Sequence, residues 1–325
     1  MEHAAPRVGL VLGAGGVAGG AFHAGVLAAL EEVTGWDPRT ASIVVGTSAG
    51  SVTGTVLRAG LSAADELARA TGDPLSRQGA RLVRAVGTPD RISPLRPTRE
   101  RVLPAQVVGT LARAAARPFG ARPWALLAAG LLPEGSTSTE LISGPIAALG
   151  RDWPPDPLWI CAVRQADGRR VVFGRGTERA PLPEAVAASC AIPTFFQPVT
   201  IDGASYFDGG VHSPTNADVL RGEAANLDLV LVSSPMSLAG RGLRLGADQA
   251  VRRWSGLLLD SEARGLRRRG VHVVAFQPTG EDIAVMGLNA MDESRRGGVA
   301  RQARASTLRR LERSDARERL AALFG

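Results

Sequence analysis

The 325 residues are enough for one large α/β domain or two smaller ones. Apolar residues make up 45% of the chain and charged residues 21%, which excludes a chain that is disordered throughout. No apolar run reaches the ~18 residues that a membrane-spanning helix needs, and the N-terminus lacks the basic and apolar regions of a signal peptide. Cys161 and Cys190 are not spaced as metal ligands, which favours buried free thiols. We therefore expect a soluble, cytoplasmic protein without a metal or cofactor.

The net charge of +7 is concentrated in two arginine-rich stretches, at residues 77–122 and 295–319, and the chain contains no lysine. Such stretches attract nucleic acid or anionic lipid, although a solvated surface also explains them. Aromatic residues make up only 4% of the chain. They do not alternate with these arginines as they do in sites that bind single-stranded nucleic acid. We expect no nucleic-acid partner, and we consider peripheral contact with an anionic membrane.

A glycine-rich loop lies between the first expected strand, residues 7–12, and a helix with apolar residues at helical spacing from Phe22 to Gly35. The backbone N–H groups of such a loop suit a phosphate or a developing oxyanion. Ala18 breaks the Gly-x-Gly-x-x-Gly pattern of dinucleotide-binding loops, and the absence of lysine excludes a Walker loop.

Ser48 lies between an expected strand at residues 43–45 and a helix that begins near Ser51. The surrounding Gly46-Thr-Ser-Ala-Gly50 has the Gly-x-Ser-x-Gly pattern, whose glycines allow a sharp turn that exposes the serine at the N-terminus of the helix. This motif alone leaves two interpretations open, a catalytic serine and a tight structural turn.

The rest of the chain predicts further elements of an α/β domain. A helix begins with a capping box at Ser62, and residues 72–145 form either an insertion that covers the site or a helical layer on the sheet. That stretch includes an apolar segment at 123–133, which suits a buried or interfacial helix. The later expected elements are hairpins at 158–173 and 199–207, a helix at 183–191, strands at 227–233 and 271–276, and a helical tail from Gly297 whose clearest apolar residues are Ala316, Leu320, Leu323 and Phe324.

Three separated motifs together resemble the patatin-like phospholipase family: Gly15-Gly-Val-Ala-Gly19, Gly46-Thr-Ser-Ala-Gly50 and Asp208-Gly-Gly210. The stretches 188–195 and 199–218 support the resemblance. It implies a three-layer α/β/α sandwich with a mainly parallel central sheet and the Ser48 turn after the second strand. The resemblance covers residues 7–235 well and continues more loosely to about 292, so we expect an acyl hydrolase domain over residues 1–292, in which the helical, arginine-rich insertion at 72–145 is a candidate cap. The resemblance does not account for 293–325, which we expect to form a basic helical tail.

The same resemblance implies a catalytic dyad without histidine that acts on lipid or other acyl esters, with Ser48 as nucleophile and Asp208 as base. A serine hydroxyl needs a base within hydrogen-bonding distance, and burial can raise the pKa of an aspartate toward the working pH. Water would then hydrolyse the acyl-enzyme. The remaining implied site groups are the oxyanion-binding N–H groups of Gly15, Gly16 and Val17, and the motif glycines Gly13, Gly19, Gly46, Gly50, Gly209 and Gly210.

The chain departs from the family pattern at Ala18, where the family usually has a basic residue, and has an extra glycine at Gly20. Without that cation, hydrolysis of neutral acyl esters is nearly as plausible as hydrolysis of phospholipids.

Other functions also fit parts of the sequence. A Ser-His-Asp esterase would use His272, which follows Ser48 and Asp208 in the chain, and His212 lies only four residues after Asp208. We expect structural or solvated roles for both, and for His3 and His23. An acyltransferase would share the dyad, and a catalytically weak protein could bind a membrane surface through its arginines.

Overall fold

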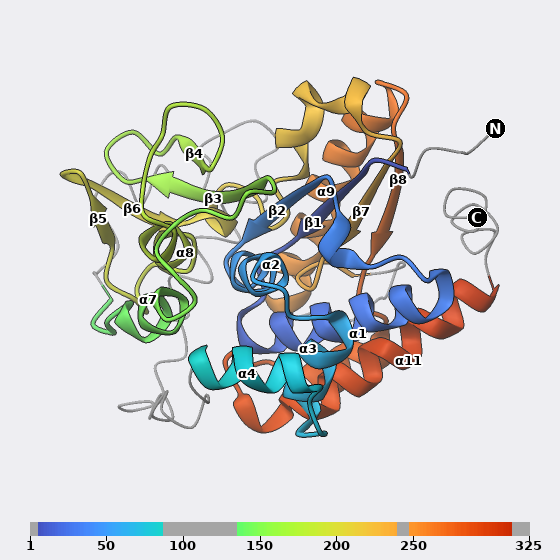
Figure 1. The fold of residues 1–325 in the computed structure, drawn as a ribbon. Helices are drawn as coiled ribbons and strands as arrows, with labels where there is room; N and C mark the ends of the chain where they lie inside the picture. Colours follow the sequence, from blue (N-terminus) through green and yellow to red (C-terminus); the bar gives the residue numbers. More distant parts are fainter. Residues whose placement is uncertain (1–5, 87–134, 239–246, 314–325) are drawn as a thin grey trace.

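The computed structural model describes residues 6–86, 135–238 and 247–313, in which one eight-stranded mixed sheet forms the centre of the molecule (Figure 1). Its strands follow the order β5-β6-β3-β2-β1-β7-β8, and β4 pairs with β3. Their bounds are β1 Val8–Leu12, β2 Ile43–Thr47, β3 Leu158–Arg164, β4 Arg170–Phe173, β5 Val199–Ile201, β6 Ala204–Asp208, β7 Leu229–Ser233 and β8 His272–Phe276. The strands and both hairpins expected from the sequence are confirmed.

The sheet is parallel from β3 through β2, β1 and β7 to β8, and antiparallel where β4 and β6 join β3 and where β5 joins β6. The parallel strands are short runs of β-branched and aliphatic residues, fully buried in β1, β2 and β7. Such runs are typical of strands that are covered on both faces.

Helices cover both faces and give the expected three layers. The described α-helices are α1 Gly16–Thr34, α2 Ala49–Arg58, α3 Ala63–Thr71, α4 Arg77–Val86, α7 Glu140–Ala147, α8 Leu182–Ser189, α9 Ala247–Arg267, α10 Gly280–Met286 and α11 Arg296–Arg313. Short 3-10 turns are η1 Pro38–Thr40, η3 Gly209–Val211, η4 Ala217–Gly222, η5 Ala224–Asn226 and η6 Glu293–Arg295.

Successive strand residues point to opposite faces of the sheet, so the core divides into two clusters. Leu10 and Leu12 belong to the cluster that includes Phe22 of α1, whereas Val11 lies in the cluster that includes Leu259 of α9. In Figure 1, α1, α3 and α11 lie together on one side of the sheet. The sheet is therefore buried between two helical layers.

Helix α11 packs along α1, and its Ala300 and Ala303 are fully buried there. At Gly25 of α1, a Cβ would lie only 2.4 Å from the Ala300 carbonyl oxygen, so the two helices approach too closely for any larger residue. The first part of the segment 293–325 thus contributes to the core. The division of the chain at residue 292 stays a prediction.

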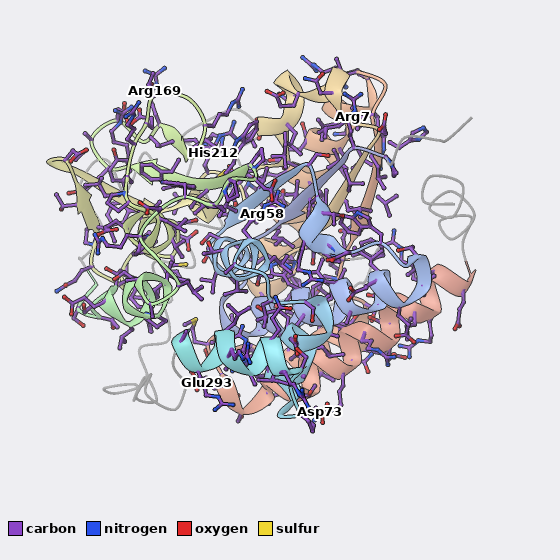
Figure 2. All side chains as sticks on the ribbon, viewed as in Figure 1. Arg7, Arg58, Asp73, Arg169, His212 and Glu293 are labelled. Carbon is purple, nitrogen blue, oxygen red and sulfur yellow. The ribbon has the colours of Figure 1, made fainter. Side chains whose placement is uncertain are left out.

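Several arginines of the C-terminal basic stretch make contacts within the protein. Arg304 pairs with Glu32 of α1, Arg309 pairs with Glu281 of α10, and Arg310 lies over the ring of Phe276. Figure 2 marks other charged residues, such as Arg7, Arg169 and Glu293, at separate places around the molecule. Most of the basic stretch at 77–122, the apolar segment at 123–133 and the apolar tail positions from 316 onward lie outside the described residues.

Candidate active site

Ser48 occupies a strained turn between β2 and α2. Its φ of 54° and ψ of −121° are rare for a residue with a side chain. A Cβ at Gly50 would lie 1.9 Å from the carbonyl oxygen of Leu12, and one at Gly46 would lie 2.5 Å from the Cα of Ser51. Both glycines are therefore required, Gly50 because the turn packs against the end of β1 and Gly46 because the turn folds back closely on itself.

The main chain of Ser48 is fixed by two neighbouring serines. Its N–H donates to Ser189 Oγ (2.9 Å), and the Ser189 hydroxyl donates in turn to the Cys161 carbonyl of β3 (2.7 Å). On the other side, the Ser51 hydroxyl donates to the Ser48 carbonyl (2.7 Å). The backbone of Ser48 is held in place while its hydroxyl points to other partners.

Strand register brings Asp208 to Ser48. Thr47, the last residue of β2, is paired with Cys161 of β3, and Asp208, the last residue of β6, is paired with Ala162. Because β4 occupies the opposite side of β3 at both positions, β2 and β6 lie end to end along one side of β3. Their carboxyl ends run toward each other and meet at the two candidate catalytic residues.

Asp208 is buried, with 5% of its surface exposed. Burial raises the pKa of its carboxyl from 3.8 to about 6, against the opposing effects of hydrogen bonds from the Ser48 side chain and the Gly210 N–H. The Gly210 N–H donates to Asp208 Oδ1 (2.7 Å), and the N–H of Asp208 donates to the Ala191 carbonyl (3.0 Å). The carboxylate of Asp208 can therefore orient the Ser48 hydroxyl and accept its proton near neutral pH.

The glycine loop before α1 lies beside this pair. A Cβ at Gly210 would lie 3.2 Å from Ala14 Cβ. Gly16 has a φ of 61°, and no acceptor for the N–H groups of Gly15, Gly16 and Val17 is found in the described part of the chain. These three groups at the positive end of α1 could bind a developing oxyanion.

Residues 10–221, more than half of the chain and including Ser48 and Asp208, match the family model described as patatin-like phospholipase. The chain belongs to the patatin-like phospholipase family. No curated protein shows significant sequence similarity to it.

Two solved structures resemble the chain at low identity. VipD from Legionella pneumophila is 13% identical, with a TM-score of 0.41 over 95% of this chain and 67% of VipD. The type III effector protein ExoU is 17% identical, with a TM-score of 0.38 over 96% of this chain and 54% of ExoU. The chain thus spans only about half the length of ExoU.

This patatin-like protein holds its glycine loop by other means than a basic residue at position 18. Ala18 is buried, and its N–H donates to the Ala290 carbonyl (2.9 Å). His23 lies within 2.8 Å of both the Gly13 carbonyl and the Ser233 hydroxyl, and burial lowers the pKa of its ring to about 4. Since a carbonyl only accepts, the neutral ring donates from Nε2 to Gly13 and accepts from Ser233 at Nδ1.

The other described histidines lie in different surroundings from the dyad candidates. His272 is exposed at the first residue of β8, which β1 and β7 separate from β2, whereas Ser48 follows the carboxyl end of its parallel strand. The structure therefore does not bring His272 to Ser48. His212, marked in Figure 2, donates its backbone N–H to the Gly209 carbonyl (3.0 Å).

Three polar residues near the site have no role in the sequence-based expectations: Ser189, Asn216 and Glu262. Ser189 belongs to the stretch 188–195 that supports the family resemblance, but its contact with Ser48 depends on how α8 packs on β3. Cys190 is also close, since its thiol lies 3.7 Å from Ser51 Oγ. Burial raises the pKa of that thiol to about 12, so it stays protonated and unreactive at neutral pH.

Proposed function

We propose that this protein is a serine acyl hydrolase that cleaves carboxylic ester bonds of lipids, with Ser48 as the nucleophile and Asp208 as the base. The observation that carries the proposal is the buried carboxyl of Asp208, with its pKa raised to about 6, beside a serine held in a strained strand-to-helix turn. Membership of the patatin-like phospholipase family supports lipid ester hydrolysis.

In the first half of the reaction, Ser48 Oγ attacks the ester carbonyl carbon while Asp208 accepts the hydroxyl proton. Negative charge develops on the carbonyl oxygen, where the N–H groups of Gly15, Gly16 and Val17 would stabilise it. The tetrahedral intermediate then collapses, and the leaving alcohol takes the proton back from Asp208. An acyl ester on Ser48 remains.

In the second half, Asp208 accepts a proton from water, which attacks the acyl-enzyme through a second tetrahedral intermediate. Collapse of that intermediate releases the carboxylic acid and returns the proton to Ser48. Each N–H donor to the oxyanion is worth about 2.7–4 kcal/mol, from the effect of removing one such donor in other hydrolases. Transfer of the acyl group to an alcohol other than water would use the same residues, and product analysis distinguishes the two.

The substrate class follows from the family and from the groups near the glycine loop. With Ala18 in place of a cation, no charge from that position selects a phosphate, so we expect both neutral acyl esters and phospholipids to be substrates. Among the described residues, no helix is long and apolar enough to cross a bilayer.

Labelling with a fluorophosphonate probe tests the proposal. We expect wild type to be labelled and to hydrolyse short-chain p-nitrophenyl esters, Ser48→Ala to lose both activities, and Asp208→Ala to lose about 10²–10⁴-fold in rate. His272→Ala serves as the control, because His272 lies across the sheet, and should keep wild-type rates. Unchanged labelling of Ser48→Ala would refute the proposal, and a loss near 10⁴-fold in His272→Ala would favour a Ser-His-Asp enzyme.

A further inference from the structure

Asn216 links the two halves of the candidate dyad through one buried side chain. Its amide Nδ2 donates to the Ser213 carbonyl (2.6 Å), to Thr47 Oγ1 (3.1 Å) and to the Gly209 carbonyl (3.3 Å), so its two N–H groups are shared among three acceptors. Thr47 immediately precedes Ser48, and Gly209 immediately follows Asp208. A single amide therefore contacts the neighbours of both reacting residues.

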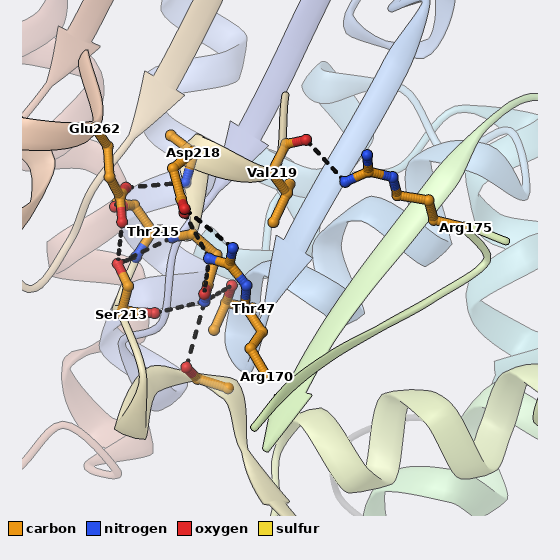
Figure 3. A network of polar contacts seen from close by, with 11 residues as sticks. Thr47, Arg170, Arg175, Ser213, Thr215, Asp218, Val219 and Glu262 are labelled. Atoms are coloured by element: carbon orange, nitrogen blue, oxygen red, sulfur yellow. Dashed lines mark hydrogen bonds and ion pairs between the residues drawn. The ribbon is translucent and has the colours of Figure 1, made fainter. Parts of the chain in front are cut away.

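The orientation of this amide is fixed by Arg170. The guanidinium donates to Asn216 Oδ1 (3.1 Å), and because arginine has no acceptor, the amide oxygen must face it. The NH2 group must then face Thr47 and Gly209. Arg170 is itself held by an ion pair with Asp218, and Figure 3 shows Arg170, Asp218 and Thr47 within one network of contacts.

A second carboxylate fixes the backbone around Asn216. Glu262 of α9 accepts hydrogen bonds from the hydroxyls of Ser213 and Thr215, both at 2.6 Å, and from the Ala217 N–H (2.9 Å). Asn216 adopts a left-handed conformation with a φ of 52°, and its own N–H donates to Ser213 Oγ (3.1 Å). Figure 3 shows Glu262, Ser213 and Thr215 as neighbours in this network.

The position of Asn216 matters because β2 and β6 meet end to end. Each strand is hydrogen-bonded to β3, but neither pairs with the other, so the ladder does not join their ends directly. The amide of Asn216 crosses this junction. It adds a short connection between Thr47 and Gly209 at the place where the Ser48–Asp208 separation is set.

We propose that Asn216 is a positioning residue that fixes the separation of Ser48 and Asp208 by binding Thr47 and the Gly209 carbonyl at the same time. The inference rests on the proposed function of the dyad. It extends that function, because the hydrogen bonds of Asn216 described above are to the neighbours of Ser48 and Asp208 and not to these two residues themselves. A displacement of about 1 Å in a catalytic group can lower a rate on the order of 10²-fold, which sets the scale of the expected effect.

Variants at Thr47 test the connection with little change of shape. Thr47→Val removes the acceptor on the Ser48 side of the Asn216 amide, and we expect kcat to fall by about 10- to 100-fold with KM nearly unchanged. Thr47→Ser keeps the hydroxyl and should restore kcat to within about threefold of wild type. The rate of fluorophosphonate labelling should follow kcat in both variants, since it reports on Ser48 itself.

Asn216→Gly provides a second, independent variant. Glycine accepts the left-handed backbone without strain, so the variant removes the side-chain amide, including its contacts with Arg170 and the Ser213 carbonyl, and keeps the backbone conformation. We expect a kcat loss similar to that of Thr47→Val and no further loss in the double variant, because both changes break the same connection. Thermal unfolding of each variant establishes that it is folded at the assay temperature.

The outcomes separate this inference from the proposed function. An inactive Ser48→Ala enzyme together with a folded Thr47→Val or Asn216→Gly enzyme of wild-type kcat would overturn the positioning role alone. Equal losses in Thr47→Ser and Thr47→Val, or additive losses in the double variant, would also overturn it. A fully active Ser48→Ala enzyme would overturn both.

Discussion

Replacement of Asp208 by asparagine should stabilise the protein while it inactivates the enzyme. The carboxyl of Asp208 is buried, and its pKa of about 6 in the folded protein exceeds the ordinary value of 3.8. An ionised carboxylate at this place therefore opposes folding, whereas the isosteric amide carries no charge. Strained or desolvated catalytic groups often reduce stability in this way.

The size of the effect follows from the pKa difference. A shift from 3.8 to about 6 corresponds to about 3 kcal/mol, at about 1.4 kcal/mol per pKa unit. Because the folded-state pKa of Asp208 is the higher one, its favourable contribution is fully present below about pH 4 and is lost as the pH rises through about 6. Asp208→Asn lacks this loss. The variant should exceed wild type by as much as about 3 kcal/mol at pH 8, and the gap should close toward pH 4.

Urea unfolding of wild type and Asp208→Asn at several pH values between 4 and 8 measures this gap. Asp202→Asn is a matched control, because Asp202 is exposed in the β5–β6 turn and has a positive φ that asparagine also accepts. We expect this control to follow wild type at each pH. If Asp208→Asn were less stable than wild type at pH 8, or if its advantage did not vary with pH, the burial argument for Asp208 would be wrong.

Three further predictions concern catalysis, the strained turn and the glycine loop. If ionised Asp208 is the base, kcat/KM for ester hydrolysis should fall below about pH 6 and be about tenfold under its plateau at pH 5. The rate of fluorophosphonate labelling, measured over the same pH range, should fall in parallel. A flat profile down to pH 5 would contradict the role of Asp208. Gly50→Ala should lower the free energy of unfolding by at least about 2 kcal/mol and abolish labelling, because the new Cβ meets backbone at 1.9 Å. Gly20→Ala is the control, because an added Cβ at Gly20 has no other atom within 4 Å, and its free energy of unfolding should be unchanged or higher by up to about 1 kcal/mol. Similar losses of stability in Gly50→Ala and Gly20→Ala would refute the packing argument. His23 should contribute a loss of about 3 kcal/mol to the stability of wild type as the pH falls from 6.5 toward 4, opposite in sign to the contribution of Asp208, since its pKa is lowered by burial to about 4 and the unfolded chain binds the proton more readily. Urea unfolding of His23→Gln should lack this dependence, and an identical pH dependence in the variant would contradict the assignment of a neutral buried ring.

Much of the fold could be predicted from local patterns in the sequence. The strands β1, β2 and β7 are short aliphatic runs between turn residues, and the glycine motifs mark positions where backbone or helix approaches closely. Helix α9 was not predicted, because arginines and glycines interrupt the face that buries Leu259, Ala263 and Leu266. Helix α10 was also missed, although Thr279 and Asp282 form a capping box at its start.

The connection between Asn216 and Thr47 could not be predicted from the sequence. It joins residues 169 positions apart, and it depends on the register of β2 and β6 along β3. The motif residues Ser48 and Asp208 carry recognisable neighbours, whereas an asparagine in a polar stretch resembles any turn residue. The clue in the chain is its distance of eight residues from Asp208, which becomes meaningful only once the fold is known.

The end-to-end meeting of β2 and β6 makes the relative position of Ser48 and Asp208 depend on β3 rather than directly on the lengths of the connecting loops. The separation of the two reacting groups depends on consecutive residues, Cys161 and Ala162, within one strand. Loops beyond α2 in the β2–β3 connection, or outside α8 in the β4–β6 connection, should tolerate changes in length, provided that Ser51 and Ser189 keep their contacts with Ser48. A single residue inserted into β3 between Cys161 and Ala162 would instead push the two strand ends apart and turn one of them toward the other face of the sheet. Loop exchange is therefore a practical route to new ester specificities on this scaffold, and β3 is the element to leave unchanged.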